Sequence, residues 1–358
     1  MAAIHQLVAG FANGDAISNE AIVMRKIFRS WGFLSDIFCE KKRVLPELRP
    51  ETRDISECHS AFQPNDIAFL HLSIGSDIND LLPKLACKKV ILYHNVTPSH
   101  YFDLINKQTA YTLERGRKQV VALANTAQVN LSDSRFNAEE LGKAGYRNVQ
   151  VLPLVLDLQR LKENPDRKTL RVYDDGTRNV IFVGRCAPNK KIEDVIKAFF
   201  YFHKYVEPDS RLILIGSYAG TERYQNLLLT QARELELSDV RFTSNIPQPQ
   251  LNAFYKCAHL FLSMSEHEGF CIPIIESMAH DIPVLAYAAA AVPETMNGAG
   301  ILFHEKRYEE IAEMMGRLIN DSQLRESVLD QQRKRIADYV SRNLAVELKQ
   351  MLFPILPQ

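Results

Sequence analysis

The sequence predicts an α/β fold with two Rossmann-like, doubly wound sheets, because short apolar runs alternate with helical stretches along its whole length. Runs rich in β-branched residues are each followed by a helix-like segment, an alternation typical of parallel sheets wrapped by helices. Runs such as "RLILIG" are almost continuously apolar, which favours strands buried on both faces. These runs form two sets: "IHQLVAGF", "DIAFLHLS", "KVILYHNV" and "QVNLSDS", and then "NVIFVGR", "RLILIGS", "DVRFTSN", "HLFLSMS" and "IPVLAYA".

The length of the chain and a polar segment near its middle predict two domains. At 358 residues the chain is long for a single hydrophobic core. Between the two sets of runs lies the polar segment "LQRLKENPDRKTLRVYDDGTRN", which we interpret as the interdomain connection. We therefore predict an N-terminal domain over residues 1–168 and a C-terminal domain over residues 169–337, facing each other across a cleft. The stretch from Asp321 to Leu352 has a helical pattern with an apolar end that can pack on another element.

Composition excludes several classes of partner. Lysine plus arginine and aspartate plus glutamate both number 43, so no net field recruits nucleic acid, and we expect none to bind. The six cysteines lack C-x-x-C spacing, as expected of reduced thiols in the cytoplasm. The N-terminal residues do not resemble a signal peptide, and no apolar run approaches the roughly 20 residues that span a bilayer. We expect a cytoplasmic protein, and peripheral contact with the inner face of a membrane stays open.

A candidate phosphate site follows the run "NVIFV". There the chain reads "GRCAPNKKIEDVIKAF", with Gly184, Arg185 and Lys190 ahead of a helix that we expect to begin near Lys191. Glycine permits close backbone approach, and a helix N-terminus and two cations can converge on a diphosphate. The alternative is a solvated basic loop that caps the helix.

Two carboxylates frame the apolar stretch "HEGFCIPIIESMAHDIPV". Pro273 fits the first turn of a helix, which places Glu268 in the preceding loop and Glu276 about one turn into the helix. Carboxylates accept paired hydrogen bonds from neighbouring hydroxyls, so this pair suits a sugar and a ribose. The alternatives are a helix-terminus charge for Glu276 and a surface charge for Glu268.

The first half offers weaker candidates. His94 ends the apolar run "KVILY", where it could contact a ligand or serve as a structural histidine. Gly14 lies in the first strand-to-helix loop, where backbone N–H groups could meet an anion. An ordinary turn capped by Asp15 or Ser18 explains the same residues equally well.

Several motifs are missing from the sequence. No G-x-G-x-x-G follows the first strand, and no G-x-x-x-x-G-K-[ST] occurs, which argues against a nicotinamide dehydrogenase and a P-loop nucleotidase. No D-x-D and no local group of histidines and cysteines indicates a metal site. We therefore expect no metal and no cofactor, with protein cations meeting the charge of a leaving diphosphate.

Three motifs in this order resemble those of the retaining glycosyltransferases called group 1 or family 4, which have the two-domain GT-B fold. "VGRCAPNKK" is similar to the family's G-R-x-x-x-x-K loop, and "EGFCIPIIE" to its E-x-x-x-x-x-x-x-E motif. "IPVLAY" followed by "VPETMNGAGILF" is similar to a family strand and loop. The likeness is strongest from Asn179 to Phe303. The family's C-terminal helix, here residues 338–358, typically packs back on the N-terminal domain.

The resemblance implies roles for single residues. Arg185 and Lys190 would hold the diphosphate of a nucleotide-sugar donor, Glu276 the ribose, and Glu268 the transferred sugar. The remaining implied contacts come from the backbone at Phe270, Cys271 and Ile272, from Gly14, and from His94, which in the family approaches the donor sugar. Two departures concern the local shape: Lys191 stands where glycine usually follows the loop lysine, and "SYAGTERY" lacks the second glycine common after the strand of "LILIG".

The resemblance implies transfer of a hexose, with retained configuration, from a donor of the UDP-glucose or GDP-mannose type. The acceptor would be a glycan or a lipid-linked acceptor, in surface polysaccharide biosynthesis. An inert nucleotide-sugar-binding scaffold and a sugar-nucleotide epimerase with the same fold are the alternatives.

Overall fold

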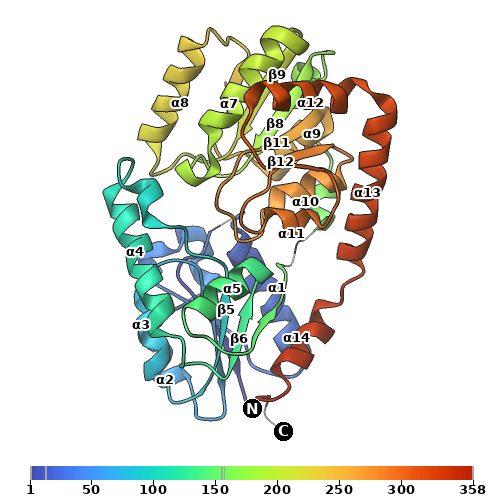
Figure 1. The fold of residues 1–358 in the computed structure, drawn as a ribbon. Helices are drawn as coiled ribbons and strands as arrows, with labels where there is room; N and C mark the ends of the chain where they lie inside the picture. Colours follow the sequence, from blue (N-terminus) through green and yellow to red (C-terminus); the bar gives the residue numbers. More distant parts are fainter. Residues whose placement is uncertain (1, 13, 155, 157, 357–358) are drawn as a thin grey trace. The chain divides into compact units, whose positions relative to one another are not determined.

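The computed structural model describes residues 2–12, 14–154, 156 and 158–356. The chain divides into two compact units. The first unit comprises Met1–His100, Lys107–Leu156 and Asn343–Gln358, and the second comprises Tyr101–Asn106 and Asp157–Arg342. Figure 1 shows both as sheets flanked by helices.

The first unit is built on a seven-stranded parallel sheet with the order β3-β2-β1-β4-β5-β6-β7. Its strands are β1 (Ile4–Val8), β2 (Ile37–Cys39), β3 (Arg53–Asp54), β4 (Ile67–Leu72), β5 (Lys88–Tyr93), β6 (Val129–Ser132) and β7 (Val149–Val151). Its helices are α1 (Ala16–Ser30), α2 (Cys58–Ala61), α3 (Asp77–Leu81), α4 (Lys107–Ala122), α5 (Arg135–Lys143) and α14 (Leu344–Leu352).

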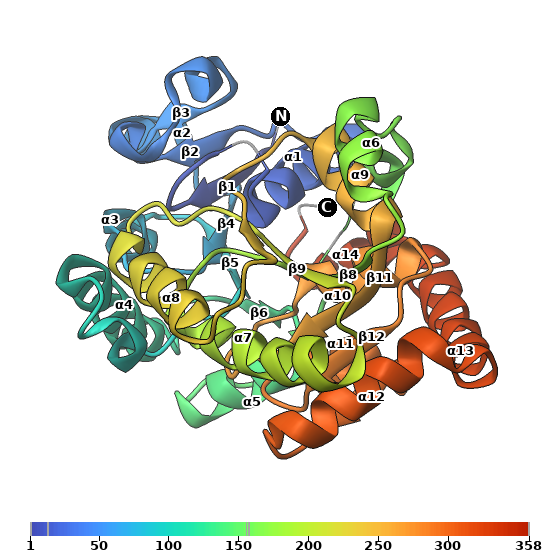
Figure 2. The same ribbon diagram turned by 90° about the horizontal axis from the view of Figure 1, so that it is seen from above.

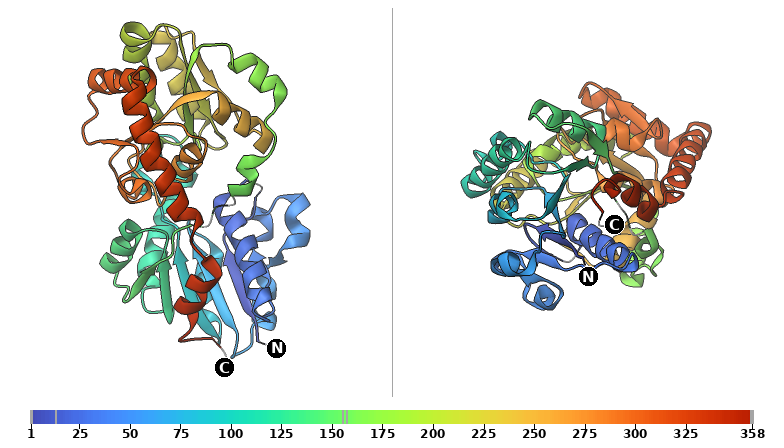
Figure 3. Two further views of the ribbon diagram at one scale, coloured as in Figure 1. Left: turned by 90° about the vertical axis from the view of Figure 1, so that its right-hand side faces the viewer. Right: turned by 90° about the horizontal axis from the view of Figure 1, so that it is seen from below.

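Helix α14 comes from the far end of the sequence and completes one apolar layer of the first unit. Leu348 and Leu352 lie in the same buried cluster as Ile4 of β1 and Phe28 of α1. The Lys88 ammonium donates to a backbone carbonyl just after this helix, the oxygen of Ile355, at 2.8 Å. Figure 3 shows α14 beside α1 on one face of the sheet. Helix α14 and Ile355 are therefore part of the first unit's core.

The second unit is built on a six-stranded parallel sheet with the order β10-β9-β8-β11-β12-β13. Its strands are β8 (Arg178–Val183), β9 (Ser210–Ile215), β10 (Val240–Phe242), β11 (Ala258–Ser263), β12 (Val284–Tyr287) and β13 (Ile301–Phe303). Its helices are α6 (Arg167–Tyr173), α7 (Ile192–Tyr201), α8 (Glu222–Glu234), α9 (Gln248–Cys257), α10 (Ile272–Ala279), α11 (Val292–Met296), α12 (Tyr308–Asn320) and α13 (Ser322–Val340).

Alternate residues of the central strands point to opposite faces of this sheet and belong to two apolar layers, one on each face. Val180 and Leu260 pack with α7 and α12, whereas Ile181 and Phe261 pack with α9 and α10. Figure 2 shows α7 and α12 on one side of the strands and α9 on the other. Burial on both faces explains why these strands are almost continuously apolar. The predicted α/β fold with two Rossmann-like sheets is confirmed.

The polar segment predicted to connect two domains has structure of its own. It contains a short 3-10 turn, Leu158–Lys162, followed by α6, which packs on α9. The Asn252 side-chain amide donates to the carbonyl oxygens of Arg160 at 2.9 Å and Glu163 at 3.1 Å. These contacts place the segment in the second unit, so the units divide near residue 156 rather than at the predicted 168, and near residue 342 rather than 337.

The C-terminal helices are amphipathic or polar. Helix α13 is the longest of the described helices, with 19 residues, and most of them are polar. In the described parts of the chain, no helix combines the length and the apolar character needed to cross a membrane.

The position of α14 predicts a large effect of truncating Leu348. This side chain is 0% exposed, so Leu348→Ala leaves a cavity and should lower the free energy of unfolding of the first unit by about 2–5 kcal/mol. Val346→Ala, at a site 49% exposed on the same helix, should cost less than about 0.5 kcal/mol. Urea unfolding followed by the fluorescence of Trp31, the single tryptophan and a neighbour of this cluster, measures both. Equal midpoints would show that α14 does not stabilise this unit.

Candidate active site

The strand order of the second unit selects one end of its sheet as a ligand site. The chain first moves outward from β8 to β9 and β10, and then returns to place β11 on the other side of β8. In such sheets ligands bind outside the carboxyl ends of the strands where the order reverses. The loop after β8 carries Gly184, Arg185 and Lys190, and the loop after β11 carries Glu268. The predicted phosphate loop and the first predicted carboxylate therefore meet at this point.

Three contacts join these two loops. The Lys190 ammonium lies 2.5 Å from the Glu268 carboxylate. The Asn189 amide donates to the carbonyl of His267 at 3.0 Å, and the N–H of Glu266 donates to the carbonyl of Asn189 at 2.9 Å. Glu268 is only 8% exposed. A buried carboxylate is costly without a counter-charge, and Lys190 of the other loop supplies that charge.

The backbone after β8 approaches the backbone after β9 closely. A Cβ atom at Gly216 would lie 1.9 Å from the carbonyl oxygen of Gly184, so only glycine fits there. The N–H of Cys186 donates to the carbonyl of Ser217 at 2.9 Å. Arg185 is exposed, and its guanidinium donates to the carbonyl of Ala219 at 3.1 Å. Arg185 therefore lies at the surface beside a third loop, where its charge is accessible.

Two helices begin at this end of the sheet from left-handed residues. Lys191, with φ 51° and ψ 47°, precedes α7, and Cys271, with φ 71° and ψ 66°, precedes α10. Neither helix has a side-chain cap at its first turn. The first N–H groups of a helix have no acceptor within the helix, and its N-terminus attracts anions. Lys191 occupies a conformation that favours glycine, which explains why glycine is usual at this position of the resembled motif.

Glu276 lies on α10 and is 4% exposed. The Arg160 guanidinium lies 2.7 Å from one of its carboxylate oxygens, and the Tyr255 hydroxyl donates to the other at 2.8 Å. Burial, together with the charge of Glu276, raises the pKa of Tyr255 well above its ordinary value, so this hydroxyl remains a donor. The carboxylate is thus held in one orientation by two neighbours.

The residues between the two glutamates are mainly buried. Phe270 packs near Tyr339, and its carbonyl accepts a hydrogen bond from the Thr295 hydroxyl. Burial and the charge of Glu268 raise the pKa of the Cys271 thiol well above its ordinary value, so this thiol is neutral. Ile272 is the first residue of α10. This segment offers a ligand backbone groups rather than a reactive side chain.

In the first unit, Gly14 lies in the loop between β1 and α1. Its φ is +74°, a conformation that favours glycine, and nothing lies within 4 Å of a Cβ built there. Asp15 caps α1, accepting hydrogen bonds from the N–H of Ser18 at 2.8 Å and from its hydroxyl at 2.6 Å. The capping role that the sequence left open is therefore present. Gly14 itself stands at the switch point of the first sheet, between β1 and β4.

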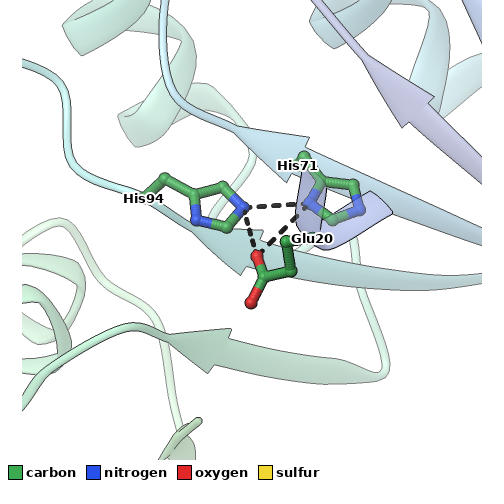
Figure 4. Close-up of side chains that lie close together, drawn as sticks. All are labelled: Glu20, His71 and His94. Carbon is green, nitrogen blue, oxygen red and sulfur yellow. Dashed lines mark hydrogen bonds and ion pairs between the residues drawn. The ribbon is translucent and has the colours of Figure 1, made fainter. Parts of the chain in front are cut away.

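His94 follows β5 and has both ring nitrogens engaged within its unit (Figure 4). Its Nδ1 lies 3.0 Å from an oxygen of Asp133, and its Nε2 lies 2.9 Å from Nδ1 of His71. Burial acts to lower the pKa of His94, but the negative charges of Asp133 and Glu20 outweigh it and raise that pKa to about 9. Burial and the neighbouring His94 hold the pKa of His71 well below its ordinary value. The His94 ring can form a hydrogen bond to a sugar only if its contact with Asp133 or with His71 is broken.

Sequence reasoning missed the partners that orient these groups. Arg160 lay in a segment interpreted as a connection, and Tyr255 lay inside a helix with no motif around it. The contacts of Glu20 and His71 with His94 were not predicted, because these residues lie more than 20 positions apart in the sequence. Asp133 follows an apolar strand, and a survey of every polar residue at a strand end would have found it.

The two sheets and the polar strand-end loops define the class of protein. The chain has the GT-B fold, and its solved structural relatives include HepE of Anabaena in complex with UDP and glucose. The two sequences are 17% identical, the TM-score is 0.73, and the match covers 99% of each chain. Residues 166–335 match the model of the family described as glycosyl transferases group 1.

Curated relatives resemble the same region. A D-inositol 3-phosphate glycosyltransferase of Corynebacterium aurimucosum is 28% identical over 225 residues, which are 59% of this chain and 52% of that protein. The capsular polysaccharide biosynthesis glycosyltransferase CapM of Staphylococcus aureus is 25% identical over 244 residues, 64% of this chain and 59% of that one. The chain thus spans about half to three fifths of the length of these relatives.

The close approach at Gly216 predicts a steric effect that a matched glycine lacks. Gly216→Ala and Gly298→Ala both place a side chain at positive φ, at +150° and +81°, but only the first new Cβ meets another atom. We expect Gly298→Ala to cost about 1–2 kcal/mol of stability from backbone strain alone. Gly216→Ala should cost about 1–3 kcal/mol more because the loop after β8 must move. Denaturant unfolding of the two variants measures the difference, and equal costs would contradict the close approach.

Proposed function

We propose that this protein is a retaining glycosyltransferase that moves a hexose from a nucleoside-diphosphate sugar of the UDP-glucose or GDP-mannose type. The observation that carries the proposal is the meeting of Lys190 and Glu268 at the switch point of the second sheet, beside Arg185 and two helix N-termini. Cations and helix N–H groups suit a diphosphate, and a carboxylate suits sugar hydroxyls. This set combines both kinds of group in one place.

The Lys190–Glu268 ion pair suggests how a donor is received. When the diphosphate binds, Lys190 exchanges its carboxylate partner for phosphate oxygens. Glu268 is then available to accept hydrogen bonds from hydroxyls of the sugar. Each group therefore keeps a partner of the right polarity before and after binding, so neither charge is left buried alone.

The proposed reaction exchanges one bond for another at the anomeric carbon. The bond from this carbon to the donor phosphate oxygen breaks, the bond to the acceptor oxygen forms on the same face, and the acceptor proton passes to the departing phosphate. Negative charge develops on the leaving diphosphate, so Arg185, Lys190 and the helix N–H groups act where they favour the transition state most. We propose that these protein cations serve without a metal ion or cofactor.

Glu276 is proposed to hold the ribose. Arg160 and Tyr255 bond one oxygen each, and a carboxylate oxygen has lone pairs for more than one hydrogen bond. The two partners fix the carboxylate in advance, which lowers the entropy lost when the ribose binds. Gly14 and His94 remain predicted donor contacts from the first unit. For His94 we propose an electrostatic role, since its two ring nitrogens already have partners.

The acceptor is proposed from the names of the relatives. These proteins include a capsular polysaccharide biosynthesis glycosyltransferase and an alpha-monoglucosyldiacylglycerol synthase. We therefore propose a glycan or lipid-linked acceptor in surface polysaccharide biosynthesis. The reaction would take place in the cytoplasm, with a lipid-linked acceptor presented at the inner face of the membrane.

A thermal-shift panel tests donor binding. UDP, GDP and ADP, with and without their sugars, are each titrated against the full chain. We expect the nucleotides of one base to raise the melting temperature with concentration, because binding at a hundred times Kd adds about 2.7 kcal/mol to the stability of the folded state. The other bases should have little effect. No stabilisation by any of these compounds would contradict a nucleotide-sugar site.

Substitutions test the assigned roles. Arg185→Ala and Glu276→Ala should each reduce kcat/KM for transfer at least about a hundredfold, as expected for loss of one well-placed polar contact. Glu276→Gln, which keeps the shape and one acceptor, separates lost charge from lost packing. Arg171→Ala and Glu313→Ala remove equally charged, exposed residues of α6 and α12 and should leave transfer unchanged. Wild-type rates from Arg185→Ala and Glu276→Ala would refute the roles.

The same assays separate the two alternatives. An epimerase would convert the donor sugar without any acceptor, whereas the proposed transferase releases the nucleoside diphosphate only as the acceptor is glycosylated. An inert scaffold would bind the donor in the thermal-shift panel and show no turnover with any acceptor.

A further inference from the structure

Lys191 holds a backbone conformation that a lysine adopts only at a cost. Its φ is 51° and its ψ is 47°, in the left-handed region, where it ends the short turn Pro188–Lys190 and precedes α7. A residue with a Cβ atom is strained there, whereas glycine is not. Single residues held in such conformations cluster at functional sites, where the surrounding structure compensates for the strain. The lysine side chain should therefore contribute something that glycine would not.

The contacts of the Lys191 side chain within the second unit are long. Its ammonium lies 3.6 Å from a carboxylate oxygen of Glu193 and 3.6 Å from one of Glu266, beyond the roughly 2.7–3.2 Å of a good N–H···O hydrogen bond. It lies 5.9 Å from the centre of the ring of Tyr101, which belongs to the same unit. The side chain is 27% exposed, and ion pairs of this kind add little to stability. These contacts do not explain why a lysine occupies this position.

Both carboxylates beside Lys191 have closer partners than this lysine. The Tyr224 hydroxyl donates to the other oxygen of Glu193. The Lys306 ammonium lies 2.8 Å from the other oxygen of Glu266. Removing one charge from a buried pair is costly because the remaining charge is left alone. Lys191 can leave these carboxylates without that cost, because each of them keeps its closer partner.

The position of Lys191 brings its ammonium next to the proposed diphosphate site. Lys191 follows Lys190 directly and precedes α7, whose first turn has no side-chain cap. Glu266 lies two residues before Glu268, and its N–H donates to the carbonyl of Asn189 at 2.9 Å. The two loops that carry Lys190 and Glu268 therefore also carry Lys191 and Glu266. A lysine ammonium is a point charge on a flexible stem, so it can turn from a carboxylate toward a phosphate oxygen.

We propose that Lys191 is a further binding residue for the diphosphate of the donor, an inference that rests on the proposed function. When the diphosphate binds, the Lys191 ammonium turns from Glu266 to a phosphate oxygen, and Glu266 keeps its ion pair with Lys306. The loop after β8 then offers three cations to the diphosphate, because Lys191 joins Arg185 and Lys190. The strained backbone at Lys191 is the cost of placing this third charge.

Binding of pyrophosphate and nucleotides to the full chain tests this role. Isothermal titration gives the Kd of inorganic pyrophosphate and of whichever of UDP, GDP and ADP stabilises the unaltered protein most. Lys191→Gly should raise both Kd values about tenfold, as expected for loss of one charged contact. The Kd of the corresponding nucleoside, which carries no phosphate, should stay the same. Lys191→Arg, which keeps the cation, should retain most of the affinity.

The melting temperature separates a binding role from a structural one. Glycine relieves the strain at positive φ, so Lys191→Gly should lower the melting temperature by no more than about 2 °C. Glu236→Gly is the matched control, because Glu236 is exposed and follows α8 with a φ of 56°. It should change none of the Kd values. A larger fall in melting temperature for Lys191→Gly, with equal weakening of nucleoside binding, would show a structural role and contradict the inference.

The outcomes distinguish this inference from the proposed function. Unchanged pyrophosphate affinity in Lys191→Gly would overturn the role of Lys191, and so would a lack of pyrophosphate binding to the unaltered chain. If the nucleoside diphosphate binds the unaltered protein and Lys191→Gly equally, the donor site stands and only the role of Lys191 fails. If no nucleotide binds the unaltered protein, the proposed function fails, and the pyrophosphate titrations alone decide whether Lys191 binds a diphosphate.

Discussion

The position of β8 at the centre of the second sheet is the constraint on which the candidate site depends. Because β9 and β11 flank β8, the loops that follow these three strands crowd together at one edge. Hydrogen bonds through Asn189 and the Lys190–Glu268 ion pair hold two of them, and the glycine contact at Gly216 brings in the third. The polar side chains lie in these loops because the rest of each strand is enclosed by apolar layers on both faces of the sheet.

The first unit repeats the same strand order, and again its buried polar groups lie toward the carboxyl ends of the central strands. Gln6, His71 and His94 follow one another through hydrogen bonds from β1 to β4 to the end of β5. Such a chain fixes the orientation of each ring, because the partner of one nitrogen decides which role the other can take. The two units thus place their ionisable groups by one topological rule, although the groups themselves differ.

The sequence predicted the α/β class and the end of the sheet where the candidate residues lie, because apolar periodicity and turn residues are local signals. Short strands such as β3 and β7 escaped prediction because two or three residues carry too little periodicity. The orientation of Glu276 also escaped, since Arg160 and Tyr255 reach it from elements 116 and 21 residues away. Contacts of that kind depend on the folded arrangement and leave no pattern in a single sequence.

Helix α14 has a consequence for how the protein is made. The first unit begins with the earliest residues of the chain but buries Leu348 and Leu352, which leave the ribosome after all of the second unit. During synthesis the second unit can complete its core while the first still exposes an apolar face beside α1. That interval is when the nascent chain would depend most on chaperones, because exposed apolar surface of this kind promotes aggregation. The order of synthesis and the order of completion are therefore opposite for the two units.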